Sequence, residues 1–308
     1  MSSTLPSDHE DRMWRAKLSL AGLSVGDAFG EQFFGHHPDR IAWAVANRGI
    51  PSGVWKYSDD TEMALAIHTI LQQRGHIDQD ELATTFVDRY WQNPNRGYGG
   101  TAHSILQAIG RGIAWRAASE GAFCGMGSMG NGGAMRVAPL GAYFADDIAR
   151  VVDEARLSAQ VTHAHPEGQA GAIAIAAAAA FAWNARERVS ADTGTELIQF
   201  ALDHTPDGET RDGILNALSL PRDISVETAV HHLGNGSKVI SQDTVPFCLW
   251  CAARHLDNYV DAMWATVSGL GDRDTTCAIV GGIVVLANGE RCIPGEWLRA
   301  REPLRYGA

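Results

Sequence analysis

The sequence lacks the features that direct a chain to export or into a membrane. Its first residues, MSSTLPSDHEDRMW, are polar and acidic, whereas a secretion signal begins with basic residues and continues with an apolar run of about 7–15 residues. The most apolar stretch, AGAIAIAAAAAFAW from Ala170 to Trp183, is shorter than the roughly 18–20 residues that cross a bilayer. We therefore expect a cytoplasmic protein with no membrane contact, in which this stretch forms a buried core helix.

Cysteine is scarce, and basic residues are too few for a general polyanion-binding surface. The five cysteines are an odd number scattered along the chain, which favours a reducing compartment. Cys248 and Cys251 form a CxxC in PFCLWCAAR, but no second pair or nearby pair of histidines completes a zinc site. We expect a packed helix there. With 25 Lys and Arg against 36 Asp and Glu, general nucleic-acid binding is not expected, because it requires clustered positive charge.

Alternating polar and apolar β-branched runs are also scarce, whereas helical periodicity is present almost throughout. In HIDQDELATTFVDRYW, Leu82, Phe86 and Tyr90 recur at four-residue steps, and Asp78 with Glu81 matches a capping box. No repeat, proline-rich linker or long charge block divides the chain. The sequence therefore predicts an all-α fold in one domain over residues 1–308, with its core at about 14–290. A monomer is expected.

Glycine, in contrast, is abundant, and it gathers in short clusters at expected helix starts. The 33 glycines include those of SVGDAFGEQFFG, NRGYGGTAHS, GAFCGMGSMGNGGAMRV and LGNGSKV. Such loops expose backbone N–H groups at helix N-termini, where anions bind. Several loops around one cleft would hold a diphosphate without net positive charge. For any single loop, a tight turn is a sufficient explanation.

Two acidic clusters stand at the start of apolar helical patterns, more than 200 positions apart. They are Asp59 and Asp60 in KYSDDTEMAL, and Asp272 and Asp274 in GDRDTT. Together with neighbouring hydroxyls they supply only oxygen ligands, which Mg²⁺ and Mn²⁺ prefer, and four carboxylates suffice for two ions. The alternative, that each aspartate only caps its helix, is adequate for one cluster but does not explain why both clusters contain paired acids.

Two known motifs with similar spacing explain GDRDTT less well. In a calcium-binding EF-hand loop, glycine would be needed where Cys277 stands and glutamate where Ile283 stands. The aspartyl-phosphate motif of haloacid-dehalogenase-type phosphatases also fits the spacing. However, too little chain follows it here, and alternating strands and helices are missing, so it is a poor second choice.

The motifs together resemble a known family. SVGDAFG, SDDTEMAL, NPNRGYGG, GNGGAMRVAPLG, VTHAHPEGQAGA, GNGSKVISQDTVPF and GDRDTT occur in the order seen in the ADP-ribosylglycohydrolases, the dinitrogenase-reductase-activating glycohydrolase family. The resemblance runs from about Leu20 to about Gly289. NPNRGYG and GNGGAMRV look particularly like the branch of the ADP-ribosylserine and O-acetyl-ADP-ribose hydrolases.

That resemblance implies a single compact orthogonal multi-helix domain with two divalent cations, Mg²⁺ or Mn²⁺, in a central cleft. The implied catalytic residues are Glu31, Asp59, Asp60 and Asp274. The implied metal ligands are Ser58, Asp59, Asp60, Asp272, Asp274 and Thr275. The implied substrate-binding residues are Gly97, Tyr98, Gly99, Gly100, Phe123 at the adenine, Gly127, Ser128, Met129, Gly130, Asn131 and His163.

The chain departs from the family pattern at two places. Related enzymes often carry a loop glutamate several residues after the GDAxG motif, where this chain has Phe33 and Phe34, so Glu31 is the nearest candidate. Arg273 replaces the small residue usual between the last two aspartates. It could pair with carboxylates, pair with a substrate phosphate or point to solvent.

The expected function is hydrolysis at C1″ of the distal ribose, releasing ADP-ribose from a modified side chain or small molecule. The expected partners are ADP-ribose and an ADP-ribosylated substrate. The alternative is a catalytically silent ADP-ribose-binding module, and turnover separates the two.

Overall fold

Helices make up nearly all the regular structure of the computed structural model, which describes residues 5–35, 37–221 and 223–306. Within these ranges β-structure is limited to two isolated bridges, Trp55 with Arg301 and Gly130 with Ile240, and the all-α prediction is confirmed. The helices are α1 (His9–Glu31), α2 (Pro38–Ala46), α3 (Asp59–Arg74), α4 (Gln79–Gln92), α5 (Gly100–Gly110), α6 (Trp115–Glu120), α7 (Ala122–Gly125), α8 (Gly132–Met135), α9 (Ala138–Tyr143), α10 (Ile148–Gln160), α11 (Pro166–Ala185), α12 (Thr193–His204), α13 (Glu209–Ser219), α14 (Val226–Leu233), α15 (Ser241–Arg254), α16 (Tyr259–Ser268), α17 (Arg273–Asn288), the 3₁₀ helix η1 (Glu290–Cys292) and α18 (Gly295–Ala300).

Local sequence signals place the helix starts that matter for the site. Helix α3 begins after Ser58, whose side chain accepts the Asp60 N–H at 3.2 Å. Helix α4 begins after Asp78, whose side chain accepts the Glu81 N–H at 3.0 Å. The predicted cap of α4 is therefore confirmed, and the paired acids of α3 occupy its first turn, where backbone N–H groups are free.

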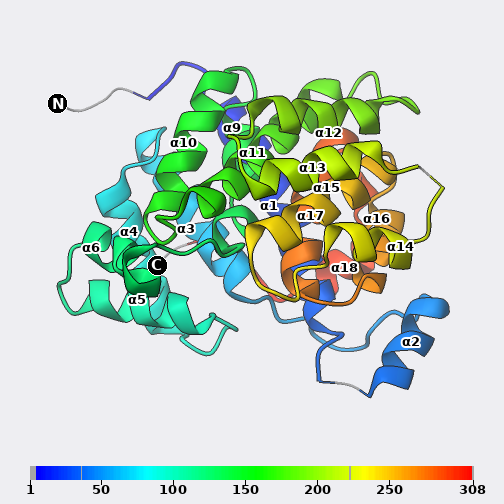
Figure 1. Ribbon diagram of the computed structural model, residues 1–308, viewed down its shortest axis with the longest axis horizontal. Helices are drawn as coiled ribbons and strands as arrows, with labels where there is room; N and C mark the ends of the chain where they lie inside the picture. The colour runs from blue at the N-terminus through cyan, green and yellow to red at the C-terminus, as the bar shows by residue number, and fades with distance from the viewer. Residues whose placement is uncertain (1–4, 36, 222, 307–308) are drawn as a thin grey trace.

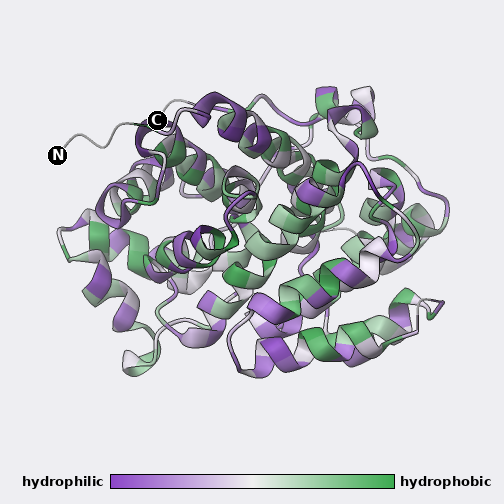
Figure 2. Ribbon diagram, turned by 90° about the horizontal axis from the view of Figure 1, so that it is seen from above, coloured by the Kyte–Doolittle hydropathy of each residue, from purple (hydrophilic) through white to green (hydrophobic). Residues whose placement is uncertain are grey.

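The core is built around α11, which lies in the middle of the molecule near α1 and α17, while α2 stands apart at the edge (Figure 1). Every residue of α11 from Ala170 to Ala182 is buried, so the predicted core helix is confirmed. Hydrophobic residues alternate with hydrophilic ones along many outer helices (Figure 2). No helix among the described residues is both long and apolar enough to span a membrane.

A seam of glycines lets α1 and α17 touch along their backbones. Gly22, Gly26 and Gly30 recur at four-residue steps, and a Cβ at any of them would lie closer than 3.0 Å to a carbonyl oxygen of α17. Real Cβ atoms do not approach so closely. The facing carbonyls belong to Gly281, Cys277 and Arg273. This seam carries the end of α1 to the start of α17, where the second acidic cluster stands.

Packing extends beyond the predicted core of about 14–290. Met13 is 8% exposed, and Trp297, in the C-terminal helix α18, is 1% exposed. The predicted domain also includes residues 1–4, 36, 222 and 307–308, which lie outside the described residues. Cys248 and Cys251 are both free and buried on α15, as expected for a packed helix.

Candidate metal centre and adjoining loops

The two acidic clusters predicted to bind metal meet at the N-termini of α3 and α17. The Asp60 carboxylate accepts the Ser58 hydroxyl at 2.7 Å on one oxygen and the Thr275 hydroxyl at 3.1 Å on the other. Asp60 and Thr275 are 215 positions apart in the chain. The fold therefore brings the first and last predicted ligand groups into direct contact.

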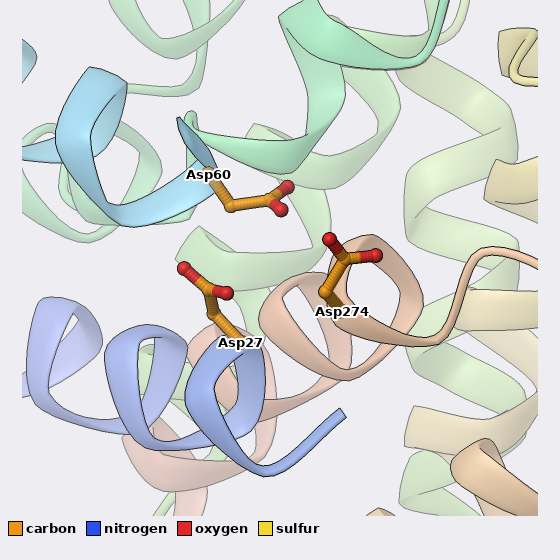
Figure 3. A group of neighbouring side chains, drawn as sticks. All are labelled: Asp27, Asp60 and Asp274. Carbon is orange, nitrogen blue, oxygen red and sulfur yellow. The ribbon is translucent and has the colours of Figure 1, made fainter. Parts of the chain in front are cut away.

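A third helix supplies an acid that the sequence prediction missed. Asp27 of α1 lies with Asp60 and Asp274 so that one carboxylate oxygen of each is within 4.8 Å of the others (Figure 3). Asp27 has no exposed surface and lies in the apolar second half of α1, between Gly26 and Gly30. A buried acid is rarely found without a partner. The sequence signal for this role was a single aspartate within the apolar stretch LAGLSVGDAFG.

Asp27 anchors the start of α3. Its carboxylate accepts the N–H of Ser58 at 2.9 Å and the N–H of Thr61 at 3.0 Å, and the Thr61 hydroxyl donates at 2.5 Å. These bonds satisfy free N–H groups of the first turn. Asp27 therefore fixes the backbone that carries Ser58, Asp59 and Asp60, in addition to contributing charge.

The carboxyls at this centre all have raised pKa values, and burial is the largest cause for each. They are the five side chains of Asp27, Asp59, Asp60, Asp272 and Asp274. The pKa of Asp27 rises to about 6 and that of Asp59 to about 8. The negative charge of Asp274 further raises the pKa of Asp60, and that of Asp272 raises the pKa of Asp274. Buried like charges disfavour one another's ionised forms in this way.

The donor chemistry fits divalent cations. In the part of the chain that the structure describes, none of the five carboxylates forms an ion pair with Lys, Arg or His. Buried carboxylates are normally paired or bound to metal. Oxygen donors from carboxylates and hydroxyls match the preference of Mg²⁺ and Mn²⁺.

The loop at residues 127–131 adjoins the centre through Asn131. The Asn131 amide donates to Asp272 at 2.7 Å and to Thr244 at 3.1 Å, so its side chain orients a predicted metal ligand. Ser128 uses its hydroxyl to accept the Gly130 N–H at 3.1 Å. The Met129 carbonyl accepts the N–H of Ser241, which joins this loop to the start of α15.

His163 lies under the same loop. A Cβ at Gly130 would be 3.1 Å from its Nε2. Burial and the nearby Arg136 lower the His163 pKa to about 3, so the imidazole is neutral at physiological pH. The Thr162 hydroxyl contacts its Nδ1 at 2.7 Å.

The predicted 97–100 segment lies against the first acidic cluster. A Cβ at Gly97 would be 3.6 Å from an Asp59 carboxylate oxygen, whereas Gly99 and Gly100 face open space. Tyr98 is buried against Tyr90 and His103, and its pKa is raised by burial and then by Asp59.

Phe123 lies on the rim of a pocket of about 340 Å³. Gly100 and Ser104 of α5 also line this pocket. The Phe123 side chain is 53% exposed and its backbone has a φ of 51°, a left-handed conformation that is unusual for an aromatic residue. Two predicted ligand residues far apart in sequence, Gly100 and Phe123, therefore share one pocket.

The structure also places the two departures from the family pattern. Glu31 ends α1 and is half-buried, and burial followed by the charge of Asp27 raises its pKa. Phe33 is buried against Trp264. Arg273 donates to the Phe33 carbonyl at 2.7 Å and lies over the Phe34 ring at 4.6 Å. Arg273 thus contacts the two residues Phe33 and Phe34, which follow the end of α1.

Arg136 is a second residue that the sequence prediction passed over, although it lies in the quoted GGAMRV motif. It is fully buried, donates to the Ser158 carbonyl at 3.0 Å, and stacks over Phe86 at 4.5 Å. Burial lowers its pKa to about 9, while the charge of Asp59 acts in the opposite direction. An arginine within a short apolar segment was the available signal.

The family model described as ADP-ribosylglycohydrolase matches residues 8–306. The chain belongs to the ADP-ribosylglycohydrolase family. It is similar to the ADP-ribosylhydrolase ARH3 of Gallus gallus, with 28% identity over 94% of this chain and 89% of that protein. The Homo sapiens ARH3 is also 28% identical, with the same coverage.

The chain is also similar to a more distant relative and to a solved structure. The ADP-ribosylarginine hydrolase Tri1 of Pseudomonas putida is 22% identical over 94% of this chain and 74% of that protein. A solved structure titled ADP-ribosylglycohydrolase-related protein complex covers 95% of this chain and 94% of its own, with a TM-score of 0.65 and 24% identity, and so shows the same fold. As an ADP-ribosylglycohydrolase, the chain is a hydrolase that acts on ADP-ribosyl glycosidic bonds.

Proposed function

We propose that the chain is a metal-dependent ADP-ribosylhydrolase that cleaves at C1″ of the distal ribose and releases ADP-ribose. The observation that supports this most directly is the convergence of two distant acidic clusters, joined by the contact of Asp60 with Thr275, beside the 127–131 loop. The leaving group is the side chain or small molecule to which ADP-ribose is attached.

Two Mg²⁺ or Mn²⁺ ions would be held by Ser58, Asp59, Asp60, Asp272, Asp274 and Thr275. Bound there, the ions would supply Lewis-acid polarisation of sugar oxygens and charge stabilisation. The chain's own groups set up this site: Asp27 fixes the first turn of α3, and Asn131 orients Asp272. Such supporting contacts determine how well ligands are placed.

ADP-ribose would extend from the metal centre towards the pocket of Phe123. Gly97, Tyr98, Gly99 and Gly100 would present the N-terminus of α5 to phosphate, and the open space at the last two glycines leaves room for it. The loop of Gly127, Ser128, Met129, Gly130 and Asn131 would surround the diphosphate and ribose, with the neutral His163 beneath it. Phe123 would stack on the adenine.

Glu31 is the proposed acid or base of the reaction, with Asp59, Asp60 and Asp274 as the other catalytic carboxylates. A raised pKa suits a carboxyl that exchanges a proton near neutral pH, and the burial of Glu31 next to Asp27 raises its pKa. The reacting sugar carbon would pass through an oxocarbenium-like state, which neighbouring carboxylates stabilise.

The proposed setting is the cytoplasm, and the proposed protein is a monomer with ADP-ribose and an ADP-ribosylated substrate as its partners. All five cysteines are free, which suits a reducing compartment.

The test is a panel of Arg-, Ser- and acetyl-linked ADP-ribose substrates, assayed with Mg²⁺, with Mn²⁺ and with EDTA. Metal-dependent release of free ADP-ribose from at least one substrate is expected. Asp60→Asn should abolish it, while Asp88→Asn, at an exposed position on α4, should not. Tight ADP-ribose binding without release from any substrate would instead identify a silent binding module.

A further inference from the structure

The C-terminal residues lie along the segment that leads into the metal-ligand helix. The Trp55 N–H donates to the Ala300 carbonyl at 2.7 Å, and the Glu302 N–H donates to the Trp55 carbonyl at 2.9 Å. Two residues further on, the Tyr57 N–H donates to a Glu302 carboxylate oxygen at 3.0 Å. Residues 300–302 therefore bind the backbone immediately before Ser58.

Glu302 reaches the metal-ligand turn by a second route through Arg96. The two side chains form an ion pair, in which Arg96 is 6% exposed and Glu302 16% exposed. The same Arg96 guanidinium donates to the Tyr57 carbonyl at 2.7 Å and lies 4.2 Å from the centre of the Tyr57 ring. The Arg96 carbonyl accepts the Asp59 N–H at 2.7 Å. The two side chains of this ion pair thus hold both backbone groups of Tyr57, and the main-chain carbonyl of Arg96 holds the N–H of Asp59.

The two glutamates around this ion pair have basic partners, in contrast to the acids of the metal centre beside it. Glu62 pairs with Arg89 at 2.8 Å and approaches Arg96 at 3.6 Å, and the Arg89 guanidinium also donates to the Arg305 carbonyl. The buried Glu62 and the partly buried Glu302 therefore each have an arginine partner. Removing the carboxylate of Glu302 would leave Arg96 buried with only the longer contact to Glu62, which is a costly arrangement.

From this geometry we infer that Glu302 is a positioning residue for the metal centre, acting with Arg96 to set the backbone of Ser58 and Asp59. The inference rests on the proposed metal-dependent function. It assigns a role in cation affinity to the C-terminal segment, which holds none of the proposed ligands. The Glu302 side chain reaches the ligands through the backbone of Tyr57 and through Arg96.

The experiment compares Mn²⁺ binding by the parent, Glu302→Ala and Glu302→Gln, using titration calorimetry and the paramagnetic resonance of free Mn²⁺. Glu296→Gln is the matched control, because Glu296 is an exposed glutamate of the same C-terminal region. Unfolding in EDTA is recorded for each protein. We expect Glu302→Ala to weaken Mn²⁺ binding by about 10-fold or more, the lower end of the range for residues that orient ligands.

Glu302→Gln should have the same direction and a smaller effect, because an amide oxygen still accepts the Tyr57 N–H while the charge opposite Arg96 is lost. It remains the test if the alanine variant does not fold. Parent-like Mn²⁺ affinity in the Glu302 variants, with only a lower melting temperature in EDTA, would overturn the inference and leave Glu302 as a stabilising contact. Failure of the parent itself to bind Mn²⁺ would refute the proposed metal centre instead.

Discussion

The contact between α1 and α17 leads to a prediction about Gly26. Replacing Gly26 by alanine places a methyl group against the carbonyl of Cys277, with the Cys277 carbonyl carbon at 2.8 Å and the Ala278 nitrogen at 3.3 Å. All these neighbours are backbone atoms, so no side-chain rotation makes room. One helix must move relative to the other.

The magnitude follows from two opposing effects. Alanine in place of glycine inside a helix stabilises the folded chain by about 1 kcal/mol. Overpacking a close contact costs typically about 1–3 kcal/mol, and more where neighbours cannot yield. Because the clash is with backbone, we expect the second effect to dominate and the free energy of unfolding in EDTA to fall by roughly 1–2 kcal/mol. The displacement also separates Asp27 from Asp274, so Mn²⁺ binding should weaken.

The assay is urea unfolding of Gly26→Ala and the parent in EDTA, followed by calorimetric titration with Mn²⁺. Gly49→Ala is the control: its added methyl would meet the side chain of Trp43 at 3.1 Å, so a change within about 0.5 kcal/mol is expected. If Gly26→Ala proves as stable as the parent and binds Mn²⁺ equally well, the close backbone seam does not position the centre.

Three further predictions concern charge and ligand contact. Asp274→Asn should lose metal and activity, yet in EDTA it should melt no lower than the parent, since one of several repelling carboxylates is gone; a clearly lower melting temperature would make Asp274 a structural cap. In EDTA the parent should gain stability as pH falls from about 8.5 to about 7, because folded Asp59, with its pKa raised to about 8, holds a proton that the unfolded carboxyl has lost. Below about pH 6.5 the lowered pKa of His163 opposes this gain, because the unfolded imidazole takes up a proton that the folded one does not. Saturating Mn²⁺ should reverse the trend, because the metal displaces protons from the carboxylates. A melting temperature in EDTA that stays constant or decreases as the pH is lowered from about 8.5 to about 7 would contradict the prediction. Phe123→Ala should weaken ADP-ribose binding by roughly 1–3 kcal/mol if it stacks on adenine, whereas Met126→Ala, an exposed apolar neighbour, should not; equal affinities by calorimetry would return Phe123 to a structural role.

Local sequence patterns were sufficient to predict the start of α4 and to identify the two acidic clusters. The capping residues Ser58 and Asp78 act within three residues of themselves, so their effect is legible in a short window. The paired acids at Asp59 and Asp272 stood out because they precede apolar helical patterns. The two clusters come into contact because the N-termini of α3 and α17 lie next to each other.

Contacts between distant segments could not be predicted in the same way. Asp27 lies inside a helix, and its role depends on contact with the start of α3, where Ser58 is 31 positions later in the chain. The Arg96–Glu302 pair joins residues 206 positions apart, and neither residue belongs to a motif that predicts the other. The four-residue spacing of Gly22, Gly26 and Gly30 was visible, but the sequence did not identify α17 as the helix that these glycines face.

Two neighbouring buried clusters show how the chain distributes charge. Glu62 pairs with Arg89 and Glu302 pairs with Arg96, so each of these glutamates has a basic partner without any ligand. At the metal centre, within the described residues, the five acids form no ion pair with a base. The charge of the buried Arg136 lowers the pKa of Asp59, but burial outweighs this effect. The same helix, α3, carries Glu62 in one cluster and Asp60 in the other. The chain therefore pairs Glu62 with an arginine and leaves Asp60, two residues earlier on the same helix, without a basic partner. A bound cation would complete this electrostatic arrangement.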